Sequence, residues 1–216
     1  MLRSVALPNV ERQAASVLRE LERRGVLLET DGHLPSLVAH VAGGPVQGSW
    51  WGHPLGHTIF AIGEMLFQNP DVLLAKLISG KATWIHRRLW PPLLAVALSR
   101  EAWQMEPLSR EARILLGEVD RDGEARATGP LARELEVRLL ARGEQAHTAS
   151  GRHAKVLESW PRWAARLRVK PLVSAAEGRR QLEGVLEELN ARFEGRGRLP
   201  WQKRTPGAPR SRGPTS

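Results

Sequence analysis

Two short segments, residues 48–57 and 81–92, hold four of the eight tryptophans and three of the seven histidines, together with a pair of arginines. The side chains concerned are Trp50, Trp51, His53, His57, His86, Arg87 and Arg88. Indole rings stack on nucleic-acid bases and guanidinium groups bind phosphates, whereas imidazoles act as acids, bases or metal ligands. The two segments therefore predict either a nucleic-acid contact surface or a pocket lined by His and Trp.

The three histidines allow two interpretations. His53 and His57 are four residues apart, a spacing that places both imidazoles on one face at the start of a helix, as metal ligands require. His86 would then be a third ligand or an acid/base group, with Glu64 as a carboxylate. The alternative is that His53 caps the helix and His57 packs against the neighbouring tryptophans. The chain has no His-Glu-x-x-His motif and no dense acidic cluster, so we predict no metal.

The adjacent Trp50 and Trp51 cannot both point inward from a regular strand, so one of them is expected at a surface, a groove or an interface. Beside Arg87 and Arg88, an exposed indole would form a stacking platform for a base while the guanidiniums contact phosphates. The alternative is that both rings cover the edge of a small core through a glycine-bounded loop.

A second basic region lies in a polar pair of strands predicted over 144–148 and 152–158. Its Arg152, His153 and Lys155 suit a hairpin that runs along phosphates. The helix before it carries as many acidic as basic side chains, which is unfavourable for insertion into a major groove. A protein-interaction role for this unit therefore stays open, and it is favoured if the neutral face of the 131–140 helix is apolar and exposed.

Composition excludes several classes of function. The chain of 216 residues has no cysteine, which rules out disulfides, thiolate metal sites and a cysteine nucleophile. No apolar run is long enough to span a membrane and no signal peptide is recognisable, so we expect a cytoplasmic protein without a membrane partner. Catalytic triads, phosphate-binding loops and dinucleotide fingerprints are absent, so we predict no cofactor.

The charge is unevenly distributed along the chain. Six of the 32 basic residues and no acidic residue fall in 195–216, so this tail carries most of the net charge of +9. The same stretch is rich in Gly, Pro, Ser and Arg and is predicted to be disordered. A basic tail binds polyanions at low salt, whereas the nearly neutral remainder need not do so.

Hydrophobic periodicity predicts the elements that position these residues. Apolar stripes and capping residues indicate helices over about 9–24, 34–42, 54–68, 90–98, 109–121, 128–139, 160–167 and 175–193. A short extended run is predicted at 26–30. A β-hairpin is predicted from 72–78 and 81–86 around Ser79-Gly80, with Thr83 and Ile85 on one face and Trp84 on the other.

Several motifs carry a resemblance to known proteins: GSWWGHP at 48–54, SGK at 79–81, HRRLWP at 86–91, EQAHT at 144–148 and KVLE at 155–158. Together they resemble a family of uncharacterised bacterial proteins over about residues 10–168. More loosely, the C-terminal half is similar to the winged-helix units of DNA-binding and DNA-repair proteins, among them a family of winged-helix DNA glycosylases. The resemblance implies a nucleic-acid context and carries over no catalytic residue.

The fold class expected from these patterns is α+β, mainly helical, with a β-hairpin and a C-terminal winged-helix-like unit. The expected divisions are a helical domain with the hairpin at 1–105, the winged-helix-like unit at 106–170, an amphipathic helix at 171–194 and a disordered basic tail at 195–216.

The function expected is binding of DNA or RNA, with DNA favoured and a role in repair or regulation. Phosphate contacts would come from Arg87, Arg88, Arg152, His153 and Lys155, and stacking from Trp50 or Trp51. One alternative is an enzyme that acts on a nucleic-acid or small-molecule substrate, in a pocket containing His53, His57 and His86. Another is a protein-interaction module.

Overall fold

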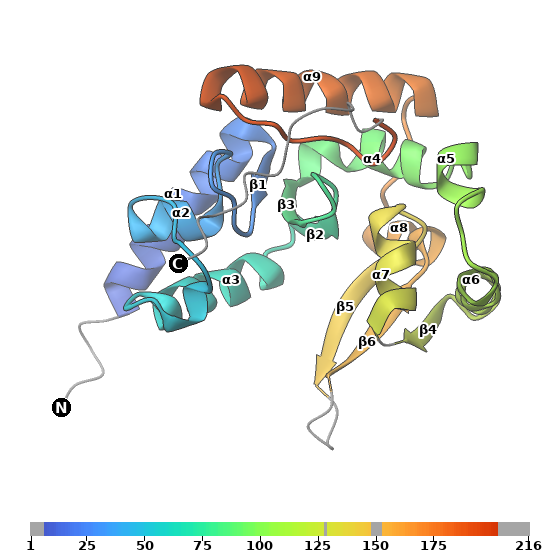
Figure 1. Ribbon diagram of the computed structural model, residues 1–216, viewed down its shortest axis with the longest axis horizontal. Coiled ribbons are helices and arrows are strands. Elements are labelled where there is room, and N and C mark those ends of the chain that lie inside the picture. The colour runs from blue at the N-terminus through green and yellow to red at the C-terminus, as the bar shows by residue number, and fades with distance from the viewer. Residues whose placement is uncertain (1–6, 128, 148–152, 203–216) are drawn as a thin grey trace, which may run out of the picture.

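The computed structural model describes residues 7–127, 129–147 and 153–202, and it confirms a mainly helical α+β fold with two small antiparallel sheets (Figure 1). Its elements in chain order are α1 (Leu7–Arg24), β1 (Val26–Leu28), α2 (Leu37–Ala42), η1 (Trp50–Gly52), α3 (Gly56–Gln68), β2 (Val72–Lys76), β3 (Ala82–His86), η2 (Arg87–Leu89), α4 (Trp90–Ala97), α5 (Ala102–Met105), α6 (Arg110–Asp122), β4 (Glu124–Ala127), α7 (Gly129–Val137), β5 (Arg142–His147), β6 (His153–Glu158), α8 (Trp160–Leu167) and α9 (Ala175–Phe193).

The first sheet has the order β1-β3-β2 and contains the predicted hairpin. The Lys81 N–H donates to the Ile78 carbonyl, and the two residues between them, Ser79 and Gly80, both have positive φ. Positive φ at both central residues gives a tight turn whose twist matches that of the flanking strands. Strand β1 joins the other edge of β3, a pairing that the local pattern of residues 26–30 did not predict.

Strand β3 separates two hydrophobic cores because alternate side chains of a strand point to opposite faces of the sheet. On one face, Ile85, Val26 and Leu73 belong to a core that is closed by α4, α8 and α9. On the other face, Trp84 and Leu27 belong to a core that is closed by α1, α2 and α3. The predicted division of the two faces of β3 is confirmed, and helices cover both.

The C-terminal unit follows the predicted succession of a helix, a short segment, a helix and a two-stranded ribbon, and the short segment forms the strand β4, which was not predicted. Ser109 caps α6 by accepting a hydrogen bond from the Ala112 N–H at 3.2 Å, and Gly123, with a φ of 80°, ends it. Strands β4, β6 and β5 form the second sheet in that order. Together with α6 and α7 they enclose a third core around Leu116, Leu135 and Leu157.

The prediction that the tail is disordered is wrong for residues 195–202. Leu199 is buried in the first core, and the Asn190 side chain exchanges hydrogen bonds with the Gly197 backbone. The Arg198 carbonyl also accepts a hydrogen bond from the Ser79 N–H at 2.7 Å. The prediction failed because it rested on the composition of the whole stretch, which is polar on average although Leu199 and Trp201 pack in or against the first core. The rest of the predicted tail lies outside the described residues.

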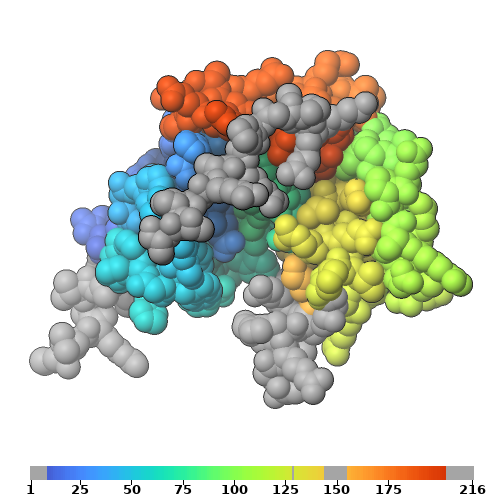
Figure 2. Space-filling model, in the orientation of Figure 1, coloured from blue at the N-terminus to red at the C-terminus, as the bar shows by residue number. Residues whose placement is uncertain are grey.

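Helix α9 runs along one side of the molecule, over α4 (Figure 1). The first core draws Ile85, Leu139 and Leu182 from three of the sequence-based divisions, so these divisions share a hydrophobic interior. On the side away from α9 the surface is hollowed between α3 and the C-terminal unit (Figure 2). Among the residues placed in the structure, no helix has both the length and the apolar character needed to cross a bilayer.

Candidate functional site

A cavity of about 620 Å³ lies between the first sheet, α3 and the C-terminal unit. The end of the first sheet forms its floor. One wall comes from η1 and α3, and the facing wall comes from α7, β5 and β6. Because its walls come from segments far apart in the chain, the cavity can place together side chains that no local motif connects.

Three residues from three neighbouring strands form the end of the floor. Ala82 on β3 lies opposite Lys76 on β2, and its carbonyl accepts a hydrogen bond from the Glu29 N–H, just beyond β1, at 2.9 Å. Glu29, Ala82 and Lys76 therefore share one face of the sheet, and all three line the cavity. Ala82 contributes only a methyl group, so the floor is open between the carboxyl and the ammonium group.

Both charged groups of the floor are perturbed by burial. Burial raises the pKa of the Glu29 carboxyl, and the nearby Lys76 opposes this shift only in part. Burial also lowers the pKa of Lys76; the charges of Lys155 and Arg133 act in the same direction, while Glu136 and Glu29 oppose it. Each group is thus shifted toward its neutral form, which is a property of candidate acid/base and nucleophilic residues in clefts.

Aromatic side chains form the wall next to α3. The ring of Trp51 is 65% exposed and stacks on Trp50 with centroids 4.2 Å apart, while Phe60 on α3 lies 5.7 Å from Trp51. Trp84 is buried at the base of this wall, and its indole N–H has no hydrogen-bond partner among the described residues. A buried donor without a partner costs about 1–3 kcal/mol, so an acceptor atom of a ligand is one means of satisfying it.

The facing wall carries an ion pair. The Lys155 ammonium on β6 lies 2.7 Å from a carboxylate oxygen of Glu136, which is buried on α7. Gly143 on β5 makes room for this carboxylate: a Cβ at Gly143 would lie 2.7 Å from the Glu136 Cδ and would overlap its Oε1. The backbone of β5 therefore fixes the position of Glu136, which in turn holds Lys155 at the cavity.

The structure brings together three of the residues predicted to bind nucleic acid. Trp50 and Trp51 line one wall and Lys155 lies on the other. As predicted, only one indole of the pair is largely exposed. The backbone of His153 pairs with that of His147 at the far end of β5 and β6, and Arg152 lies outside the described residues.

Arg87 and Arg88 do not line this cavity. The Arg87 guanidinium is exposed and pairs with the Asp71 carboxylate at 2.9 Å. The Arg88 guanidinium donates to the backbone carbonyls of Glu22 and Arg23 at the end of α1. The arginine pair predicted as a phosphate clamp thus makes its contacts within the fold, at a different place from the tryptophans.

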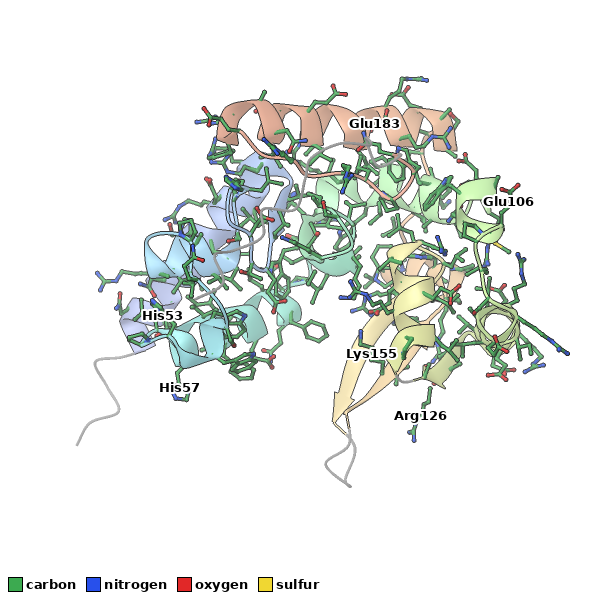
Figure 3. The ribbon with its side chains drawn as sticks, viewed as in Figure 1. His53, His57, Glu106, Arg126, Lys155 and Glu183 are labelled. Atoms are coloured by element: carbon green, nitrogen blue, oxygen red, sulfur yellow. The ribbon has the colours of Figure 1, made fainter. Side chains whose placement is uncertain are left out.

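The three histidines of the predicted pocket lie outside the cavity. His53 follows η1, and its Nδ1 accepts a hydrogen bond from the Leu55 N–H in the turn before α3. The N-cap of α3 is Leu55, without a side-chain cap hydrogen bond, so His53 does not cap the helix as the alternative interpretation had it. His57 is exposed near the start of α3, and Figure 3 places both on the side of the molecule away from Lys155. No group of three or more His, Asp or Glu side chains suited to a metal ion occurs within the described part of the chain.

His86 is at the end of β3, where its Nδ1 accepts a hydrogen bond from the Arg88 N–H at 3.4 Å. Burial lowers the pKa of its imidazole; the charges of Arg88 and Arg87 add to this, while Glu22 and Asp71 oppose it. Its role in the structure is to start η2 by this hydrogen bond.

Sequence reasoning missed Glu29, Lys76 and Glu136. A local signal did exist for the first two: each follows a run of apolar strand residues and keeps the alternation that directs it toward the same face as Leu27 or Leu74. No corresponding signal existed for Glu136, because its place at the cavity depends on the packing of α7 against β5.

As a whole, the cavity offers one ligand a ring-stacking surface, the indole N–H of Trp84, three carboxyl groups (Glu29, Glu64 and Glu136), two amines (Lys76 and Lys155) and the guanidinium of Arg142. No protein-family model, curated protein or solved structure matches the chain.

Proposed function

We propose that the protein binds DNA that offers an unpaired base, and that this base enters the cavity and stacks on Trp51. The observation that carries the proposal is the exposed indole of Trp51, held by stacking on Trp50 at a cavity with Lys155 on its facing wall. Base stacking on an aromatic ring contributes about 1–3 kcal/mol per base and requires a base that is not paired in a duplex.

The charges around the cavity support contacts to the backbone beside the stacked base. Lys155 is on the facing wall, and Arg133 is exposed on α7, close enough to Lys76 to lower its pKa. Ammonium and guanidinium groups on one side of a stacking surface match the alternation of base and phosphate along a single strand. The carboxyl groups that line the cavity, on Glu29, Glu64 and Glu136, would repel phosphate but can accept hydrogen bonds from a base.

A binding titration tests the proposal. Fluorescence anisotropy with labelled single-stranded and duplex DNA is measured at about 100 mM salt, where charges are screened beyond about 10 Å. The full chain is compared with a chain that ends at Gln202 and so lacks most of the basic tail. We expect the shortened chain to retain binding to single-stranded DNA and to prefer it over duplex.

Trp51→Ala is expected to weaken single-strand binding of the shortened chain about 5- to 150-fold. The matched control is Leu172→Ala, because Leu172 is also strongly exposed, at 75%, but lies away from the cavity. This control variant should bind like the parent chain. Loss of all binding when the tail is removed, or unchanged binding of Trp51→Ala, would refute the proposal.

An enzymatic function is the second candidate, and Glu29 and Lys76 favour it. An acid and an amine that face each other across Ala82 in a cavity can exchange protons with a bound ligand. The interaction-module alternative depended on an exposed apolar face of the 131–140 helix. Ala132 and Leu135 of α7 are instead buried in the third core, so we do not pursue it.

A further inference from the structure

Lys76 differs from the other lysines near the first sheet. Lys81 pairs with Asp31 and Lys155 pairs with Glu136, each at 2.7 Å. Lys76 is half-buried in the cavity, yet no carboxylate oxygen of the described residues lies within 4 Å of its ammonium group. A half-buried amine that no ion pair holds is available for reaction with a ligand.

The surroundings of Lys76 leave space for such a ligand. Its neighbour across the hairpin is Ala82, whose methyl group is the smallest side chain that a chiral residue can place there. Glu29 stands on the other side of Ala82, two strands away from Lys76 and on the same face. With strands about 4.8 Å apart, the two functional groups flank a space about two strands wide.

The electrostatic environment favours the reactive form of the amine. The lowered pKa of Lys76 raises the fraction of neutral amine near neutral pH, and only the neutral amine is a nucleophile. The raised pKa of Glu29 increases the fraction of its carboxyl group that carries a proton, which it can donate to a departing hydroxyl group.

We propose that Lys76 is a nucleophilic amine that forms an imine with an aldehyde carried by the ligand of this cavity. The inference rests on the proposed function, because it takes the ligand to be DNA. The carbonyls of the bases are amide-like and resist amines, whereas the ring-opened deoxyribose of an abasic site presents a free aldehyde at C1. An abasic site also leaves its neighbouring bases partly unstacked, which suits the exposed ring of Trp51.

The reaction is a condensation without a redox step. The Lys76 nitrogen attacks C1, a C–N bond forms as the C=O π bond breaks, and the oxygen takes up one of the two amine protons to give a carbinolamine. The nitrogen then loses its remaining proton while the hydroxyl group, protonated by Glu29, leaves as water and the C=N bond forms. One amine and one aldehyde thus give one imine and one water, and Glu29 recovers its proton from the nitrogen.

Borohydride trapping tests this inference on the full chain. A labelled single-stranded oligonucleotide with one abasic site is incubated with the protein and sodium cyanoborohydride, which reduces an imine to a stable amine. A parallel reaction uses 2-deoxyribose 5-phosphate, a small aldehyde. We expect a covalent complex on a denaturing gel, and peptide mass spectrometry that places the adduct on Lys76.

Two variants separate the chemistry from the fold. Lys76→Arg keeps the positive charge and should lose the adduct while it still binds the oligonucleotide without reductant. Ala82→Val keeps Lys76 but fills the space beside it, and should lower the adduct yield if the folded state is retained. The matched control is Lys170→Arg, since Lys170 is exposed outside the cavity, and its adduct yield should equal that of the wild type.

The outcomes distinguish the two proposals. If the oligonucleotide binds but no adduct forms, or the adduct lies on other lysines, the inference about Lys76 is overturned and the proposed function stands. If the small aldehyde is trapped on Lys76 while no DNA binds, the amine chemistry stands and the DNA ligand is overturned. Trapping of both probes by Lys76→Arg as efficiently as by the wild type overturns the inference in every form.

Discussion

The guanidinium of Arg88 closes the C-terminal end of α1. It donates to the carbonyls of Glu22 and Arg23, two of the groups that a helix leaves without partners at this end. Gly25 permits the contact, because it has a φ of 85° and a Cβ there would lie 2.8 Å from the Arg88 Nη2. Donors that already face carbonyl oxygens are poorly placed for phosphates, so Arg88 contributes to the stability of α1 rather than to the proposed DNA contacts.

Gly143 sets the position of the charged groups on the facing wall, and its substitution gives a prediction at the level of one residue. In Gly143→Ala the new Cβ would overlap the Glu136 carboxylate, which must move away from Lys155. We expect the free energy of unfolding to fall by about 1–3 kcal/mol, as for overpacking elsewhere. Urea unfolding followed by tryptophan fluorescence measures this loss.

Gly117→Ala is the matched control for this prediction. Gly117 lies in α6, and a Cβ added there would have no neighbour within 4 Å. Alanine in a helix interior is favoured over glycine by about 0.5–1 kcal/mol, so this variant should be as stable as the wild type or more so. An equal fall in the free energy of unfolding of Gly143→Ala and Gly117→Ala would show that stability does not depend on the close approach of Gly143 to Glu136.

At the scale of elements, the first sheet holds Glu29 in surroundings that disfavour its charge, and this predicts a pH dependence of stability. Because burial raises the pKa of Glu29, the folded state binds the proton more tightly than the unfolded state does. Below the pKa of Glu29 in the unfolded chain, near 4.5, the carboxyl group is protonated in both states, so its charge does not lower the free energy of unfolding. As the pH rises through the folded pKa, the wild type loses stability relative to Glu29→Gln.

Urea unfolding at about pH 4 and about pH 7 measures the effect. The free energy of unfolding of Glu29→Gln, relative to that of the wild type, should be higher at about pH 7 than at about pH 4. Glu64→Gln provides the comparison, because it removes the same charge from an exposed position on α3 in the same cavity. A constant difference between Glu29→Gln and the wild type would contradict the prediction.

Helices and strands were predictable where the residues that determine them lie within the element itself or at its ends. Ser109 and Gly123 marked the two ends of α6, and alternation divided the faces of β3 correctly. The cavity floor was not predictable, because Glu29, Ala82 and Lys76 become neighbours only when β1 and β2 pair with opposite edges of β3. Strand pairing depends on long-range packing, about which periodicity along the chain carries no information.

The histidine-centred pocket shows the limit of reasoning from spacing. A four-residue spacing places His53 and His57 on one face only if both lie in the helix, whereas α3 begins at Gly56. His53 therefore precedes the helix and serves its entry turn. The tryptophans beside it were recognised correctly as partly exposed, because two consecutive bulky rings rarely share one interior.

At the scale of the whole molecule, residues 195–202 link α9 to the turn at Ser79, and truncation tests their contribution. A chain that ends at Gln202 keeps Leu199 in the first core and the hydrogen bond from Ser79 to Arg198. A chain that ends at Glu194 loses both. We expect the second truncation to lower the free energy of unfolding by about 2–5 kcal/mol, as for removal of a buried leucine side chain.

Thermal and urea unfolding of the two truncated chains and the full chain provide the measurement. The chain ending at Gln202 should unfold within about 0.5 kcal/mol of the full chain. A similar loss of stability in both truncated chains would place the stabilising contacts beyond Gln202. No loss in the chain ending at Glu194 would show that Leu199 contributes nothing to the first core.

The contact between Arg198 and the turn at Ser79 also has a consequence for synthesis on the ribosome. The hairpin is translated well before the segment that packs Leu199 against the first core, because the contact between Arg198 and Ser79 joins positions 119 residues apart. Until then the growing chain exposes apolar side chains of the first core, which is the condition under which chaperones engage and aggregation begins. Completion of this core therefore waits until residues 195–202 have left the ribosome, and formation of the hairpin alone does not make the core native.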